Sequence, residues 1–281
     1  MSPRDPCAYW LSLLVLFLGG CGAERTDVAP KEEVAPKEDW GVRRWADAVE
    51  SLREGHNWSQ HYVSTEVTCG LCAKEFLAAG LDTYSTRSPD LDFKPNGLSA
   101  DPNLFALWMC PNCGYCAFAE DFADPKDPEP IRLAVSGSPV YGSYFDVPYS
   151  VLLRAAEKCY RARPYAAWDW AWLYLYGAWV ARESERPAEE REYHGEARRR
   201  FEALAGTATG EKRAQAAYLV GEINRRYGRL DAARTWLDRA EQIAKDTKSD
   251  AVPSWIEACR KKMESDRTPK DTGTTAPAVP R

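Results

Sequence analysis

The sequence predicts an α+β protein in which a small β module built around four cysteines is followed by an all-α domain. Two observations predict this order. Two Cys-x-x-Cys pairs, flanked by short apolar stretches, lie in the first half of the chain. Amphipathic segments of helical spacing fill the second half, and two of them resemble each other. A chain of 281 residues is long enough for two domains with buried cores.

The expected organisation has six parts. We expect a signal segment over 1–20, a flexible tether over 21–39, an N-terminal helix with the cysteine module over 40–124, a linker over 125–147, a helical domain over 148–265 and a disordered tail over 266–281. The formal net charge of −5 argues against a nucleic-acid partner, because such proteins normally present a basic surface.

The N-terminus predicts a targeting segment. Its apolar run, Ala8 to Leu18, is shorter than the roughly 20 residues of a membrane-spanning helix. The run ends in Leu18-Gly19-Gly20-Cys21, which resembles the lipobox of bacterial lipoproteins, whose cysteine is acylated. The resemblance implies lipidation at Cys21 and anchoring in the bacterial cell envelope, and Gly22 favours the periplasmic face of the outer membrane. An ordinary secretory signal with a chance cysteine is the alternative.

The residues after Cys21 predict a spacer and then the start of folded structure. Val28-Ala-Pro-Lys-Glu32 recurs as Val34-Ala-Pro-Lys-Glu38, a charged repeat with nothing to bury. An apolar pattern at Trp45, Ala48, Val49 and Leu52 then predicts an amphipathic helix that ends at Gly55.

The cysteine module has the composition of a four-thiolate metal site. Cys69-Gly-Leu-Cys72 and Cys110-Pro-Asn-Cys113 each let one tight turn present two sulfurs to one ion, and Gly114 can take the positive φ that closes the second turn. We expect strands over 61–68, 76–83 and 104–109, and a loop with little apolar material over 88–103. This order is typical of a zinc-ribbon-like module, with Phe76 and Phe118 as candidates to cover the metal.

Other interpretations of the cysteines stay open. The second pair also resembles a rubredoxin knuckle, which would hold iron and carry electrons. An oxidising compartment favours disulfides or thiol redox chemistry instead. Cys116 continues the spacing and could be a spectator, an additional ligand or a redox-sensitive thiol. His56 and His61 precede the first pair and could replace one thiolate.

The second half predicts six helices, over 148–163, 165–183, 189–205, 211–227, 230–246 and 251–263. Tyr174-Leu-Tyr-Gly177-Ala is echoed by Tyr218-Leu-Val-Gly221-Glu, with small residues spaced as in tetratricopeptide repeats. Gly177 and Gly221 are therefore expected at close helix contacts, with Arg225 facing outward. The helix from 165 places Trp168, Trp172 and Trp179 on one side and Trp170 and Tyr174 on another, which favours a buried central helix over an aromatic ligand groove.

These motifs together resemble a bacterial family, domain of unknown function 2225. The resemblance spans about residues 60 to 246 and depends on Cys69-x-x-Cys72, Arg87-Ser-Pro-Asp-Leu-Asp-Phe93, Asp101-Pro-Asn103 and Cys110-Pro-x-Cys-Gly-Tyr115. It implies the metal module and a tetratricopeptide-like C-terminal half, and it names no reaction. The chain departs from the family pattern at Gly70, where proline is usual, and at Cys116, where a small residue is usual.

The sequence favours a non-enzymatic role. The chain has no His-Glu-x-x-His, Gly-x-Ser-x-Gly or Rossmann glycine pattern. We expect a lipid-anchored zinc-binding scaffold whose helical domain binds an unknown protein or peptide. An envelope thiol-redox or iron electron-transfer protein is the alternative, and an enzyme with a site between its two domains is a third hypothesis.

Overall fold

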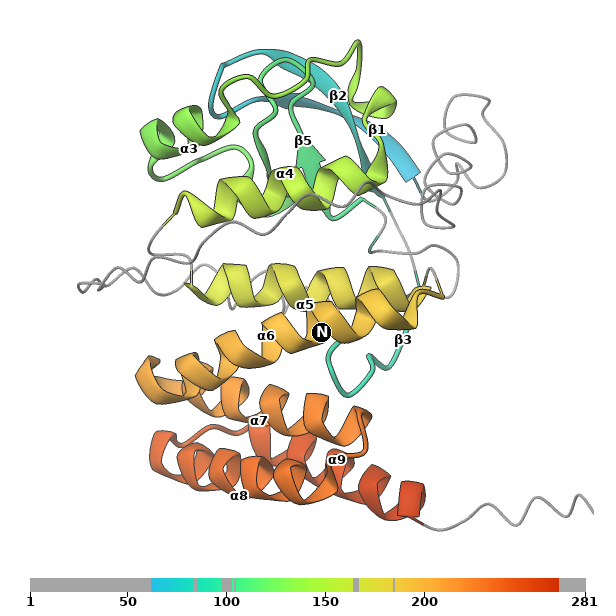
Figure 1. The fold of residues 1–281 in the computed structure, drawn as a ribbon, viewed down its shortest axis with the longest axis vertical. Helices are drawn as coiled ribbons and strands as arrows, with labels where there is room; N and C mark the ends of the chain where they lie inside the picture. The colour runs from blue at the N-terminus through green and yellow to red at the C-terminus, as the bar shows by residue number, and fades with distance from the viewer. Residues whose placement is uncertain are drawn as a thin grey trace, which may run out of the picture. The chain divides into compact units, whose positions relative to one another are not determined.

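The computed structural model describes residues 62–82, 85–97, 103, 105–163, 167–183 and 185–267. Cys21, His56, His61, the expected helix before Gly55 and nearly all of the expected tail lie outside these residues. The chain forms two compact units (Figure 1). Among the described residues, the strand-containing unit comprises those from Tyr62 to Ser88 together with Pro95–Ala197, and the C-terminal helical unit comprises Pro89–Lys94 together with the residues from Arg198 to Arg267.

In the residues that the structure describes, the strand-containing unit holds three two-stranded antiparallel sheets. In the first, β1 (Tyr62–Thr68) pairs with β2 (Glu75–Leu81), from Tyr62↔Leu81 to Thr68↔Glu75. In the second, β3 (Thr86–Arg87) pairs with β4 (Asn96–Gly97). In the third, β5 (Leu107–Met109) pairs with β6 (Cys116–Phe118). The expected small β module is confirmed, and each Cys-x-x-Cys pair lies in the turn of one hairpin.

The segment expected as a linker over 125–147 contains a helix, α3 (Pro128–Val135), which buries Ile131 and Val135. The prolines of this segment suggested a broken chain. However, Pro128 lies in the first turn, where backbone N–H groups have no intrahelical acceptor, so proline costs no hydrogen bond there. A short 3₁₀ turn, η3 (Tyr144–Asp146), follows, and another, η2 (Ala119–Asp121), comes just after β6.

The six predicted helices are present, each within a few residues of its expected bounds. They are α4 (Tyr149–Arg161), α5 (Ala167–Glu183), α6 (Pro187–Thr207), α7 (Gly210–Arg226), α8 (Leu230–Thr247) and α9 (Val252–Arg267). In the C-terminal helical unit, α7, α8 and α9 pack against one another (Figure 1). The helical second half is confirmed, whereas its relationship to tetratricopeptide repeats stays a prediction. Among the described residues, no helix combines the length and apolar character needed to cross a membrane.

The units do not divide the chain at residue 148, where the helical domain was expected to begin. Helix α4 packs against β5 and β6, and the backbone N–H of Cys116 donates a hydrogen bond to Cys159 Sγ at 3.4 Å. Helix α5 belongs to the same unit and is buried over 173–181. Its rings form the two expected sets, with Trp172 contacting Trp168 and Trp179 at 6.1 Å each, and Trp170 stacking on Tyr174.

Two glycines allow helices to approach closely, as predicted. A Cβ on Gly177 of α5 would lie 2.9 Å from the Tyr193 ring of α6. A Cβ on Gly221 of α7 would lie 2.9 Å from Leu237 Cδ2 of α8. The outward orientation expected for Arg225 is wrong, because its side chain is 9% exposed and pairs with Glu222. Helical periodicity places Arg225 at the edge of the apolar face, and the buried carboxylate draws it inward.

Candidate metal centre

Four thiol groups come together where the turns of the first and third hairpins meet. The ligand atoms of Cys69, Cys72, Cys110 and Cys113 all lie within 4.8 Å of one another. Two cross-hairpin distances, from Cys69 Sγ to Cys113 Sγ and from Cys72 Sγ to Cys110 Sγ, are both 3.7 Å. A tetrahedral zinc ion with bonds of about 2.3 Å places its sulfurs about 3.8 Å apart, whereas a disulfide needs about 2.05 Å. The spacing therefore fits four thiolates around one ion.

The two knuckles have the same backbone hydrogen bonds. In the first, the Cys69 carbonyl accepts from Ala73 N–H at 2.8 Å, and Cys69 N–H donates to the Lys74 carbonyl at 2.9 Å. In the second, the Cys110 carbonyl accepts from Gly114 N–H at 2.9 Å, and Cys110 N–H donates to the Tyr115 carbonyl at 2.8 Å. The backbone of each turn is thus fixed by the same two hydrogen bonds.

Both turns close through a residue with positive φ. Gly114 has a φ of +76°, as the sequence predicted, and a Cβ there would lie 2.6 Å from Ser138 Cβ. The equivalent residue in the first turn is Ala73, with a φ of +56°. An L-residue with a side chain is disfavoured by roughly 1–2 kcal/mol in this region. The first turn therefore carries backbone strain that the second avoids.

Neighbouring groups hold the knuckles in place. The side-chain amide of Asn112 donates to Cys72 Sγ at 3.5 Å, a bond that stabilises thiolate charge. Arg132 of α3 donates to the Leu71 carbonyl at 3.1 Å, and Tyr141 N–H donates to the Pro111 carbonyl at 2.9 Å. Helix α3, absent from the sequence-based expectation, is thus a support of the first knuckle.

Gly70, in the first knuckle, lies where a side chain has no room. A Cβ built on Gly70 would lie 2.4 Å from Pro125 Cδ and 2.5 Å from the Ala123 carbonyl oxygen. The segment after η2 therefore runs against the first knuckle at a distance that only glycine permits.

Electrostatics within the cluster favour a bound cation. Hydrogen bonds from the Cys110 and Cys113 thiols hold the pKa of Cys69 well below its ordinary value. The hydrogen bond with Cys110 raises the pKa of Cys113 well above its ordinary range. One thiolate forms readily, and later ones meet increasing repulsion from a like charge. A divalent cation removes that repulsion, because it lets all four sulfurs ionise together.

Cys116, the additional ligand candidate, lies outside the four-thiol cluster. It is fully buried, and its Sγ donates to the Leu152 carbonyl of α4 at 3.4 Å. Burial raises the pKa of Cys116 well above its ordinary value, and burial raises that of Cys159 to about 11. Both are neutral thiols that pack between β6 and α4, so the structure favours the spectator interpretation of Cys116.

A buried polar cluster follows the second knuckle, and sequence reasoning did not find it. The Tyr115 ring stacks on Phe122 at 4.9 Å, and its hydroxyl accepts a hydrogen bond from Arg163 at 2.7 Å. Tyr160 donates to the Asp121 carboxylate at 2.9 Å and lies beneath the Arg163 guanidinium at 4.9 Å. These side chains tie the Cys-Gly-Tyr end of the knuckle to α4. Their partners are distant in sequence, so only the tyrosine after Gly114 was a visible signal.

The two phenylalanines proposed to cover the metal pack against other rings. Phe76 contacts Phe122 at 5.7 Å and Tyr144 at 6.4 Å between ring centroids. Phe118 contacts Tyr160 at 5.8 Å and Tyr176 at 5.6 Å. Both side chains are half-buried in these ring contacts.

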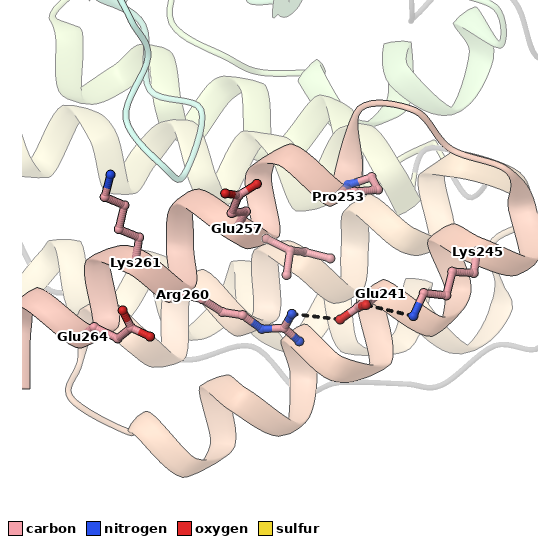
Figure 2. A pocket seen from close by; sticks show the side chains of 8 residues that line it. Glu241, Lys245, Pro253, Glu257, Arg260, Lys261 and Glu264 are labelled. Atoms are coloured by element: carbon pink, nitrogen blue, oxygen red, sulfur yellow. Dashed lines mark hydrogen bonds and ion pairs between the residues drawn. The ribbon is translucent and has the colours of Figure 1, made fainter.

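A surface groove lies between α8 and α9 and has a volume of about 490 Å³ (Figure 2). It is lined by three acidic and three basic side chains, together with Pro253 and Ile256. Glu241 lies 2.8 Å from both Lys245 and Arg260, and these side chains are well exposed. Because the opposite charges neutralise one another in solvent, we assign no ligand to this groove.

Comparison with known proteins gives one family. The model of the family described as "Uncharacterized protein conserved in bacteria (DUF2225)" matches residues 62–263, which is more than half of the chain. No curated protein matches, and no solved structure does. The matched region includes both knuckles, the Asp90-to-Phe93 segment, helices α4 to α8 and most of α9.

Proposed function

We propose, from the premise that this chain belongs to the bacterial family DUF2225, that it is a non-enzymatic interaction protein braced by one structural zinc ion. The observation that carries the proposal is the clustering of the Cys69, Cys72, Cys110 and Cys113 sulfurs within 4.8 Å of one another. Four protein ligands complete the coordination of zinc and leave no position for water or substrate. Such a site stabilises a fold, and zinc bound there supplies no reaction step.

The role of the ion follows from the chain between the knuckles. In the described residues between Cys72 and Cys110, the elements are the short strands β2 to β5, and the first and third hairpins each provide half of the ligands. A bound ion joins them and closes the connection. Apparent binding free energies of structural zinc sites are on the order of 10–16 kcal/mol in small modules. An ion of this affinity would be part of the folding of the strand-containing unit.

The interaction role rests on the helical second half and on the N-terminus. Stacked helix pairs commonly expose surfaces that bind peptides, and the resemblance between the segments around Gly177 and Gly221 supports such a role. The lipobox-like sequence ending at Cys21 supports a lipid anchor in the bacterial cell envelope, facing the periplasm. The protein would thus be a scaffold at a membrane surface, with a protein or peptide as its partner.

Metal analysis tests the central part of this proposal. Purified protein should be colourless and contain one zinc per chain by elemental analysis, and Cys110→Ser should lose most of it with a loss of β-sheet ellipticity. Cys116→Ala is the matched control and should retain the zinc, because the Cys116 thiol faces α4. Full zinc in Cys110→Ser would contradict the ligand assignment. One iron per chain with red absorption would support the electron-transfer alternative instead.

Acyl labelling tests the anchor separately. Full-length protein made in a bacterial host should incorporate labelled fatty acid and partition into detergent, whereas Cys21→Ser should do neither. Unchanged labelling of Cys21→Ser would overturn the anchor and leave the zinc site unaffected.

A further inference from the structure

Six residues from the first half of the chain, Pro89–Lys94, belong to the C-terminal helical unit. They form the tip of the hairpin that β3 and β4 close, and we call them the tip segment. The tip is a tight turn, because Phe93 N–H donates to the Asp90 carbonyl at 2.8 Å and Asp90 N–H donates to the Lys94 carbonyl at 3.0 Å. Phe93 has a φ of +64°, which turns its side chain out of the strand direction.

The tip segment places its aromatic side chain between two helices. The Phe93 ring, 6% exposed, lies 5.4 Å from Tyr218 of α7 and 4.6 Å from Trp255 of α9 between centroids. Tyr218 and Trp255 also contact each other at 5.8 Å, so three rings form one cluster. The Tyr218 hydroxyl donates to the Leu91 carbonyl at 2.7 Å. Tyr218 therefore contacts both a backbone carbonyl and an aromatic ring of the tip segment.

The charge of the tip segment is recognised by an arginine. Arg226 Nη2 of α7 lies 3.5 Å from the fully buried Asp92 carboxylate and 4.0 Å from that of Asp90. The buried Glu222 is held mainly by Arg225, at 2.6 and 2.8 Å, and lies 3.8 Å from Arg226 Nε. Arg225 thus neutralises Glu222, while the nearest carboxylate to Arg226 is the one on the tip.

These contacts have the make-up of a peptide-recognition site. An aromatic anchor packed against two rings, an arginine for acidic side chains and a donor for a backbone carbonyl are the elements that give affinity and specificity in such sites. We infer that the surface of α7 and α9 formed by Tyr218, Arg226 and Trp255, called the groove from here on, is a binding site for a turn-shaped acidic segment of a partner protein, of the type Asp-x-Asp-Phe. In this structure, the chain's own tip segment occupies the groove. The inference rests on the proposed interaction role and gives it a location and a ligand chemistry.

Because the chain's own tip segment occupies the groove, a partner has to compete with it for binding. A partner binds only in the fraction of molecules whose tip segment has left the groove, so its apparent affinity falls by that fraction. A tethered competitor also has a high effective concentration, on the order of mM for a short connection. Weakening the tip segment should therefore strengthen binding of the same chemistry supplied from outside.

The experiment supplies the tip segment as a separate molecule. A fluorescent cyclic peptide of residues 87–96, cyclised to hold the turn, is titrated against the full chain while anisotropy is followed. Phe93→Ala in the chain removes the aromatic anchor of the tip and should bind the peptide at least about tenfold more tightly than the wild type does. Adding Arg226→Ala to that variant should weaken binding at least about tenfold, and a Phe93→Ala peptide should not compete.

Several outcomes would overturn the inference. One is the absence of saturable binding to a Phe93→Ala chain that keeps its native helical ellipticity, and another is equal binding of the Phe93→Ala peptide. If the Phe93→Ala chain loses its native ellipticity, hydrogen–deuterium exchange on the wild-type chain is used instead. Peptide at mM concentration should displace the tip segment and raise deuterium uptake in residues 85–97. Unchanged uptake would overturn the inference. A concentration-dependent dimer formed by exchange of the tip segment would assign the groove to a second copy of this chain. It would overturn the assignment of the groove to a partner protein.

The result can be separated from the zinc test. Failure of peptide binding with one zinc still present removes only the groove assignment. Peptide binding by a chain that holds no zinc removes only the metal part of the proposed function.

Discussion

Glycines at close helix contacts allow a stability test with a matched control in each unit. Replacing Gly221 by leucine forces a Cβ to within 2.9 Å of Leu237 Cδ2 and 3.4 Å of the Ala233 carbonyl oxygen, both on fully buried residues. Gly206, in the same unit, has nothing within 4 Å of its Cβ position. Gly177 and Gly195 form the equivalent pair in the strand-containing unit, where the obstacle is the rigid Tyr193 ring.

The magnitude follows from the difference within each pair. Overpacking a core typically costs about 1–3 kcal/mol. Leucine also removes the helix penalty of glycine, a gain of up to about 0.8 kcal/mol that both members of a pair share. Gly221→Leu should therefore be about 1–3 kcal/mol less stable than Gly206→Leu, and Gly177→Leu less stable than Gly195→Leu by at least as much.

Urea unfolding followed by far-ultraviolet circular dichroism measures these differences. In the C-terminal helical unit, 1 kcal/mol also shifts the melting temperature by about 4–8 °C, because the shift is larger in a smaller unit. Equal unfolding midpoints within both pairs would show that the α5–α6 and α7–α8 contacts are not as close as described here, and would refute the reasoning from Cβ distances.

Three further predictions concern the knuckles and the surface. Gly70→Ala should lower the free energy of unfolding by about 1–3 kcal/mol in a urea titration, because its Cβ would meet Pro125 and Ala123; an unchanged midpoint would contradict the contact. Ala73→Gly should raise that free energy by up to about 1 kcal/mol, since it relieves a φ of +56°, and a loss of stability would count against strain there. The Lys262 hydrogen bond lowers the pKa of Asp266 from its usual 3.8, and the Lys245 hydrogen bond lowers that of Glu241 from its usual 4.5. Their stabilisation is present above these usual values and is lost as the pH falls below them, so the melting temperature should drop between about pH 5 and pH 3, and a flat profile would contradict it.

The helices and the thiol cluster could be predicted because their signals are local. Each Cys-x-x-Cys spacing is a property of four consecutive residues, and helical periodicity repeats within one element. The close contacts at Gly177 and Gly221 followed from a resemblance between two such segments. In each case, the pattern that predicts the feature lies within one short segment of the sequence or within two segments that resemble each other.

The features that were missed depend on partners far away in the sequence. Residues 88–103 were expected to hold little apolar material, yet Phe93 is buried against helices that follow much later. Arg225 also pairs with Asp266, which lies 41 residues later in the sequence. Arg163, which donates to the Tyr115 hydroxyl, lies 48 residues after it and belongs to no motif. Local pattern carries no information on such pairings.

The tip segment is synthesised long before the helices that it contacts. Leu91 and its donor Tyr218 are 127 residues apart, and the tip leaves the ribosome first. At about 5–20 residues per second, it waits roughly 6–25 s before α7 exists. Joining the two ends of such a connection costs about 4 kcal/mol of chain entropy, which the folded residues between them reduce. The tip segment is thus always synthesised before the groove. Every newly synthesised groove is therefore already tethered to its own tip segment when it first meets a competing ligand.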